Sequence, residues 1–209
     1  ITATANVISE EKMAIVVQEV VGTEDSGYYF PTISGVARSI NFYPIGDETA
    51  EDGIANIALG LGKLVVEGGQ TLRFSPRYQK NVLQLSTAEL ALRDTQREMY
   101  ALSMKPEEFK TSIDDAVNLK RFEVNSPVTR GFRNMRYVAS TWDMQNQSIS
   151  DSNFTEGRKI VTFAHILKYD TFPLAEIIRD MLEMGQREMR TPVEMEFAVN
   201  MDVTYGKEA

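Results

Sequence analysis

The sequence predicts an α+β fold, in which a mixed or antiparallel sheet carries helices mainly on one face. Three observations predict it. β-branched apolar runs, separated by glycine and proline turns, fill the first part of the chain. A long amphipathic pattern at Pro173–Met189 and a strictly alternating stretch at Val193–Phe197 close it. Strands and helices do not alternate as they do in a parallel sheet, so we expect antiparallel or mixed pairing.

The expected strands are short and apolar. Met13–Val21 reads M-A-I-V-V-Q-E-V-V, and a run of this kind is typical of a strand that is buried on both faces. Gly22 ends it, and a polar turn follows. Further strands are expected at Tyr28–Phe30, Ile33–Ile40, Ile54–Leu59, Thr71–Ser75 and Val82–Leu85.

The helices and the middle of the chain are less regular. In Pro173–Met189, apolar residues recur every three or four positions, and proline suits the first turn of a helix. Thr87–Ser103 shows a weaker helical stripe, and Lys63–Glu67 predicts a helical turn. The remaining expectations are a change from helix to strand over Ile113–Val124, a long polar loop at Ser140–Phe154 and a β-like segment at Arg158–Ile166.

Composition excludes several classes of protein. The chain has 209 residues, no cysteine, one histidine and a net charge of −8. The absence of cysteine excludes disulfides, thiolate nucleophiles and cysteine-based zinc sites. It is compatible with a reducing compartment, so we expect a cytoplasmic location. The acidic balance argues against a nucleic-acid partner. No apolar run approaches the ~18 residues that span a bilayer, so no membrane partner is expected.

The alternating stretch near the C-terminus offers a candidate metal site. In V-E-M-E-F, the side chains of Glu194 and Glu196 point to the same face of a strand, roughly 7 Å apart. Like charges at this spacing repel, and a divalent cation offsets the repulsion. Carboxylate oxygens suit Mg²⁺ when phosphates supply the other ligands. An exposed edge strand with two solvated glutamates explains the same pattern, so both interpretations stay open.

Two glycine-containing turns are candidate phosphate contacts. Gly60 and Gly62 follow a buried strand, where backbone N–H groups are able to approach phosphates. The third glycine of a dinucleotide fingerprint is missing, and a plain tight turn accounts for the same residues. Ser34 and Gly35 are equally compatible with a β-bulge. Arg130, Arg133 and Arg136 form a basic group that suits either phosphate binding or a solvated face.

Taken in order, these motifs resemble a known family. M-A-I-V-V-Q-E-V-V-G, then I-S-G-V-A-R-S, then I-A-L-G-L-G-K-L-V-V-E-G-G, a long helix and P-V-E-M-E-F are similar to the nucleotide-binding domain of the phosphoenolpyruvate synthase and pyruvate phosphate dikinase family. That family has an ATP-grasp-like fold. The resemblance covers residues from about 12 to 69 and from about 173 to the end. It implies that residues 1–209 are the C-terminal part of such a domain, a fragment of a longer chain, with an insertion at about 76–172.

The resemblance also implies roles for single residues. Glu194 and Glu196 match the paired acids that hold Mg²⁺ on the phosphates of ATP and act in catalysis. The other matching positions are expected to bind ATP: Gln18, Glu19, Val20 and Val21 in the adenine-reading strand, Ser34 and Gly35 in the S-G-V segment, and Gly60 and Gly62 in the G-L-G turn. The implied reaction is ATP-dependent phosphorylation of a histidine on a swivelling domain, followed by transfer of the phosphoryl group to pyruvate. Pyruvate and phosphoenolpyruvate are expected to bind to other domains of the full chain.

Departures from the family pattern favour rival interpretations. Lys63 stands where the family usually has glutamate, and Arg38 where it usually has an aromatic residue. The phosphate-gripping arginine and lysine, the phosphohistidine domain and the pyruvate-binding barrel are not in this sequence. We therefore expect the isolated chain to be inactive. The alternatives are a catalytically inactive nucleotide-binding regulatory domain and a protein-interaction module, and a homodimer is compatible with the sequence.

Overall fold

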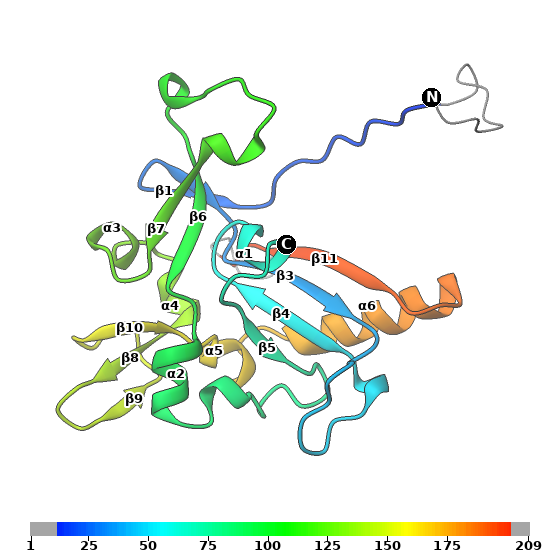
Figure 1. The fold of residues 1–209 in the computed structure, drawn as a ribbon. Coiled ribbons are helices and arrows are strands. Elements are labelled where there is room, and N and C mark those ends of the chain that lie inside the picture. The colour runs from blue at the N-terminus through cyan, green and yellow to red at the C-terminus, as the bar shows by residue number, and fades with distance from the viewer. Residues whose placement is uncertain (1–11, 202–209) are drawn as a thin grey trace, which may run out of the picture.

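The computed structural model describes residues 12–201, and it is an α+β structure whose strand pairs are all antiparallel. This confirms the predicted class. One four-stranded sheet has the order β11-β3-β4-β5, and a second four-stranded sheet has the order β1-β2-β6-β7 (Figure 1). The strands are β1 Thr23–Asp25, β2 Tyr28–Phe30, β3 Ile33–Arg38, β4 Ile54–Ala58, β5 Leu72–Phe74, β6 Glu98–Ser103, β7 Leu119–Glu123, β8 Ala139–Asp143, β9 Ser148–Ser150, β10 Arg158–Val161 and β11 Glu194–Val199.

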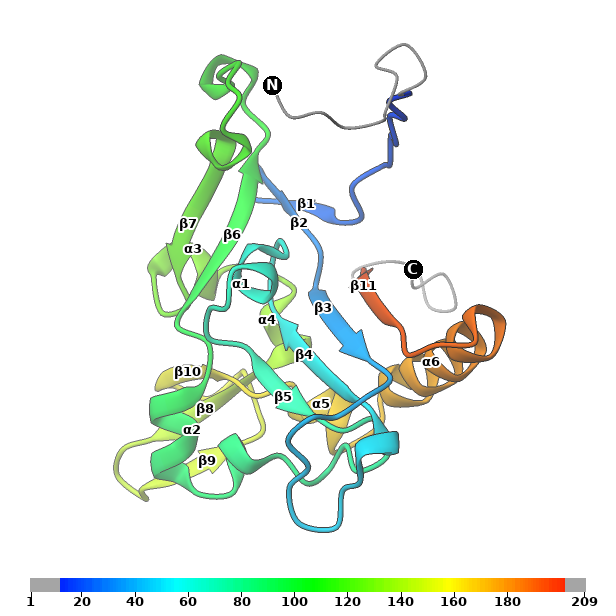
Figure 2. The same ribbon diagram turned by 45° about the vertical axis from the view of Figure 1, so that its right-hand side comes forward.

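The helices are divided among the sheets: α6 lies behind the β11-β3-β4-β5 sheet, α3 packs on β7, and α2 lies near β8 and β9 (Figure 1). The 16-residue α6 is the longest of them, and Leu174, Ile178 and Leu182 on one side of it are buried. Figures 1 and 2 show α6 behind β3 and β11, with the opposite face of the sheet largely uncovered apart from α1 at one end. The helices are α1 Lys63–Val66, α2 Ala88–Asp94, α3 Pro127–Arg130, α4 Met135–Val138, α5 Ala164–Leu167 and α6 Leu174–Met189.

One hydrophobic core joins the sequence-distant parts. Phe30 and Ile33 from the first third are buried together with Met99 and Phe163 from the middle and with Ile178 of α6. Residues between 76 and 172 therefore do not pack as a separate body. β6 from this range pairs with β2, and the amide of Leu61 donates to the carbonyl of Tyr100 at 2.9 Å, which ties β4 to β6.

The expected strand at Met13–Val21 is wrong. The segment has no regular secondary structure, and Ile15 and Val17 are 87% and 89% exposed. The cause lies in the pairing of β3: β11 occupies the edge of β3 opposite β4. Asn200 at the end of β11 donates to the carbonyl of Gly22 at 3.0 Å, so β11 meets the start of β1. β11 therefore occupies the edge of β3 beside which the residues before Gly22 would have to lie. No strand within residues 12–201 pairs with them.

Four other expectations are corrected, all between residues 76 and 172. The segment expected to be β-like at Arg158–Ile166 is a strand only over Arg158–Val161, and α5 begins at Ala164. The helix expected at Thr87–Ser103 ends at Asp94, and Glu98–Ser103 forms β6 because Met99 and Ala101 alternate into the core. Val82–Leu85 contains a 3₁₀ turn and no strand. The expected loop at Ser140–Phe154 contains β9 and most of β8, paired as a hairpin through Trp142 and Ile149. Polar composition hid this hairpin, because its strands alternate serine and threonine with a few apolar residues.

The close pairing of β3 and β11 depends on a glycine. A Cβ atom on Gly35 would lie 2.3 Å from the ring of Phe197, its direct partner across the two strands. We predict that Gly35→Ala lowers the free energy of unfolding by about 1–3 kcal/mol, the usual cost of overpacking. Urea unfolding followed by circular dichroism measures it.

Gly185→Ala is the matched control. The added Cβ of this helical residue meets Val193 at 3.4 Å, an ordinary contact. Alanine also has the higher helix propensity. Equal stability of Gly35→Ala and the unsubstituted protein would contradict the packing of Phe197 against the β3 backbone.

Candidate functional site: the carboxylate face of β11 and β3

Glu194 and Glu196 lie on the same face of β11 and both are exposed. Met195, Phe197 and Val199 alternate with them and pack against the hydrophobic core. Alternation on a strand produces this division, and α6 covers the core side (Figure 2). The two carboxylates therefore project from the uncovered side of the sheet, which we call the carboxylate face.

Antiparallel register continues the carboxylate face across the sheet. Directly paired residues have side chains on the same face. Glu194 pairs with Arg38, Glu196 with Val36, and Ala198 with Ser34 on β3. The Glu196 row extends to Asn56 on β4 and to Arg73 on β5. At its far end this row opens into a hollow of about 360 Å³ that both Asn56 and Arg73 line.

Arg38 neutralises one of the two acids. Its Nε donates to Oε2 of Glu194, and the two side chains are each about half exposed. The repulsion between Glu194 and Glu196 is therefore offset in part by a cation that the sheet itself supplies. A metal ion at this pair would compete with Arg38 for Glu194, whereas the carboxylate of Glu196 has no hydrogen bond or ion pair to any residue within 12–201.

Ser34, Gly60 and Gly62 meet at the other end of the carboxylate face. The hydroxyl of Ser34 donates to the carbonyl of Gly60 at 2.8 Å. A Cβ on Gly62 would stand 3.8 Å from that of Ser34, so the turn lies directly over this residue. Gly60 has φ +90°, and a Cβ there would come within 2.7 Å of the carbonyl oxygen of Tyr100. The turn thus needs glycine for the join between β4 and β6.

Lys63 begins α1 next to this turn. Its ammonium contacts Glu67 and lies 5.9 Å from the centre of the Tyr100 ring. Tyr100 also accepts the amide hydrogen of Leu61, so the turn, α1 and β6 are held together by one residue. The cation is directed along α1 in this arrangement.

The other residues expected at an ATP site are not brought to these side chains. Gly35 faces away from the carboxylates, because it pairs with Phe197 on the core side. Gln18, Glu19, Val20 and Val21 belong to the exposed segment before β1, and this segment leaves the sheet in Figures 1 and 2. Its contact with the fold is a hydrogen bond of 2.9 Å from the Tyr29 hydroxyl to the Val20 carbonyl.

The carboxylates fit a metal ion only together with further ligands. Two carboxylates on one strand face supply hard oxygens of the kind Mg²⁺ prefers, and phosphates usually complete such sites. Within residues 12–201, no three acidic or histidine side chains converge as a metal site. Glu194 and Glu196 therefore suit a metal–phosphate complex better than the bare cation.

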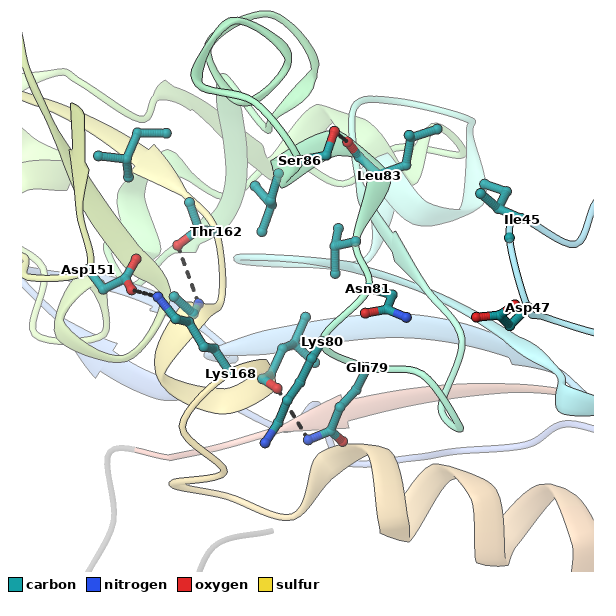
Figure 3. A pocket seen from close by; sticks show the side chains of 16 residues that line it. Ile45, Asp47, Gln79, Lys80, Asn81, Leu83, Ser86, Asp151, Thr162 and Lys168 are labelled. Atoms are coloured by element: carbon teal, nitrogen blue, oxygen red, sulfur yellow. Dashed lines mark hydrogen bonds and ion pairs between the residues drawn. The ribbon is translucent and has the colours of Figure 1, made fainter. Parts of the chain in front are cut away.

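Sequence reasoning missed a large cavity, which lies away from the carboxylate face. It measures about 660 Å³ and is bounded by the loop at residues 45–47, the strap at residues 79–86, β9 and α5. Figure 3 shows Asp151 and Lys168 at one side of it and Asp47 at the other. Val82, Ala164 and Leu167 supply apolar wall. These segments are far apart in sequence and share no motif, so only the folded chain reveals the cavity.

An ion pair holds one wall of this cavity. Lys168 Nζ donates to Asp151 Oδ2 at 2.6 Å, and the Tyr169 hydroxyl donates to the same oxygen at 2.9 Å. Burial acts to raise the pKa of Asp151, but the hydrogen bonds from Lys168 and Tyr169 together outweigh it and leave the pKa below its ordinary value of 3.8. The hydrogen bond to Asp151 raises the pKa of Lys168 above its ordinary value of 10.5.

This ion pair predicts a pH-dependent contribution to stability. Because the pKa of Asp151 is lowered, its contribution is present above pH 3.8 and is lost as the pH falls through the folded-state pKa. Because that of Lys168 is raised, its contribution is present below pH 10.5 and is lost at higher pH. We expect Asp151→Asn to cost about 1 kcal/mol at pH 7 and progressively less as the pH falls below 3.8. Denaturant unfolding at pH 7 and at several lower pH values measures this. A cost that does not change with pH would contradict the role of the charge.

Comparison with known proteins identifies the family. The family model described as the pyruvate phosphate dikinase AMP/ATP-binding domain matches residues 4–206. No curated protein and no solved structure matches the chain. No helix within residues 12–201 is long and apolar enough to cross a membrane. The match includes residues 76–172, and the insertion expected there stays a prediction. Since the match covers nearly the whole sequence, the chain belongs to the family of pyruvate phosphate dikinase AMP/ATP-binding domains.

Proposed function

We propose that this chain is the ATP-binding part of a phosphotransferase of the phosphoenolpyruvate synthase and pyruvate phosphate dikinase type. The observation that carries the proposal is the carboxylate face: two acids of β11 stand exposed on one side of the sheet, inside a chain that belongs to an AMP/ATP-binding family. In a complete enzyme of this kind, ATP would phosphorylate a histidine on a swivelling domain, and the phosphoryl group would pass from there to pyruvate.

The residues of the carboxylate face have distinct tasks in this proposal. Glu194 and Glu196 would hold Mg²⁺, which when bound with ATP neutralises charge on the phosphate oxygens. Ser34 and the Gly60–Gly62 turn lie on the same face and would border the nucleotide. Positioning and charge neutralisation account for most catalysis in phosphoryl transfer, so a rigid sheet is a suitable support for these groups.

Nucleotide titration tests the proposal. We expect the chain to bind ATP with Mg²⁺ more tightly than ATP with excess EDTA. Glu196→Gln should weaken binding of the magnesium complex about tenfold, since it removes a charge-assisted contact, and should leave binding in EDTA unchanged. Isothermal titration calorimetry measures both. We also expect no transfer of phosphate to pyruvate by the 209-residue chain.

Glu188→Gln is the matched control, because Glu188 is an exposed residue at the end of α6. It should bind nucleotide like the unsubstituted chain. Absence of any response to ATP with Mg²⁺ would contradict the proposal and would favour a protein-interaction module.

Arg38 favours a second candidate, a nucleotide-binding regulatory domain that lacks turnover. The guanidinium already pairs with Glu194, so the metal-binding capacity of the acid pair is reduced. If so, Arg38→Met should tighten binding of ATP with Mg²⁺ by up to about fivefold, because an exposed ion pair contributes at most about 1 kcal/mol. The same calorimetry measures this effect.

Arg179→Met on α6 removes a comparable partly exposed arginine and serves as the control. The opposite outcome is equally informative. Weaker nucleotide binding by Arg38→Met would show that Arg38 contacts the phosphates, as arginine commonly does. That result would contradict competition between Arg38 and the metal.

A further inference from the structure

A basic hollow lies where β6, β7 and β10 come together. It measures about 340 Å³, and its wall is formed by the turn before β6, the end of β7 and the start of β10. Figures 1 and 2 show β10 beside the lower ends of β6 and β7, away from β11. None of the residues that line it belongs to the carboxylate face. Its volume lies at the lower end of the range for small-molecule sites, about 300–1,000 Å³.

The charge of this hollow is opposite to that of the protein. Three arginine side chains and two acidic ones line it, a net charge of +1, whereas the whole chain carries −8. The arginines are Arg97, Arg121 and Arg158, and the acids are Glu98 and Glu123. A concave wall with an excess of positive charge attracts anions.

The protein itself does not supply a carboxylate partner for each of these arginines. Nε of Arg121 lies 3.3 Å from Oε2 of Glu98, and the guanidinium of Arg97 donates to the backbone carbonyl of Arg93 at 3.1 Å. The side chain of Arg158 makes no hydrogen bond or ion pair with any residue in the range 12–201. At least one guanidinium at the hollow is thus available to a ligand. Its planar fork matches the oxygens of phosphate or carboxylate.

The side chain of Lys159 is directed away from the hollow. Its ammonium donates to the Thr141 hydroxyl and to the carbonyls of Asn153 and Thr155, at 2.6–2.8 Å. None of these three residues lines the hollow, so the anion site is formed by the arginines and not by Lys159. Burial, and then the nearby charge of Arg130, lower the pKa of Lys159 below its ordinary value.

We propose that this hollow is a second anion site, which binds a small phosphate-bearing molecule between Arg97, Arg121 and Arg158. A phosphate monoester carries about −1.5 to −2 at pH 7, opposite in sign to the net charge of the side chains that line the hollow. The buried amide of Gln96 and the Asn125 side chain form the polar end of the same wall. The site is independent of the carboxylate face and does not require the proposed ATP-binding function.

Inorganic phosphate is the probe for this site, titrated in EDTA at constant ionic strength with chloride as the reference anion. Without a divalent cation the carboxylate face repels anions, so the two sites are separated. We expect saturable shifts of the backbone amide NMR signals of residues 95–98, 121–125 and 158–160. Arg158→Gln should weaken phosphate binding about tenfold, because it removes a charge-assisted pair.

Two further variants make the outcome decisive. Arg187→Gln removes an arginine that is 75% exposed on α6, and it should bind phosphate like the unsubstituted chain. Glu196→Gln alters the carboxylate face and should also leave phosphate binding in EDTA unchanged. The proposal is overturned if phosphate shifts none of these signals more than chloride does, or if Arg158→Gln binds phosphate as tightly as the unsubstituted chain.

Discussion

The pairing of β11 with β3 is the interaction on which the rest of the structure depends. It joins residues 194–199 to residues 33–38 in an unbroken antiparallel register. The ring of Phe197 lies against the backbone of Gly35, and on the other face Glu194 meets Arg38. With this register, the face of β11 that packs against the core is turned toward α6, and the two carboxylates lie on the opposite face. A slip by one residue would exchange the two faces and bury the acids.

The same pairing explains the exposed segment before β1. In the sheet, β11 holds the edge of β3 that a longer β1 would need, and Asn200 at its end is hydrogen-bonded to Gly22. Met13–Val21 consequently presents a β-branched apolar run to solvent, although its composition is that of a buried strand. Its sequence suits a partner strand, and that partner is not supplied by residues 12–201.

Parts of the fold that depend on local pattern could be predicted from the sequence, and parts that depend on distant pairing could not. The period of apolar residues in α6 and the alternation in β11 are local, and both elements were placed within a few residues. Met99 and Ala101 continue the apolar pattern that predicts a helix from Leu92 onward. They belong to a strand because β6 pairs with β2 and β7. At the site, alternation alone predicted that Glu194 and Glu196 share a face. The ion pair to Arg38 and the basic hollow at Arg158 required the register between strands remote in sequence.

Paramagnetic NMR tests the central claim most directly, since it locates a bound metal–nucleotide complex on the sheet. Mn²⁺ broadens the signals of nearby nuclei, and ATP added with a trace of Mn²⁺ in place of Mg²⁺ should broaden the amide signals of β11, of β3 and of the Gly60–Gly62 turn. The amides of α6 behind the sheet should be affected less. Broadening confined to the 660 Å³ cavity beside α5, with β11 unaffected, would contradict the assignment of the nucleotide site to the carboxylate face.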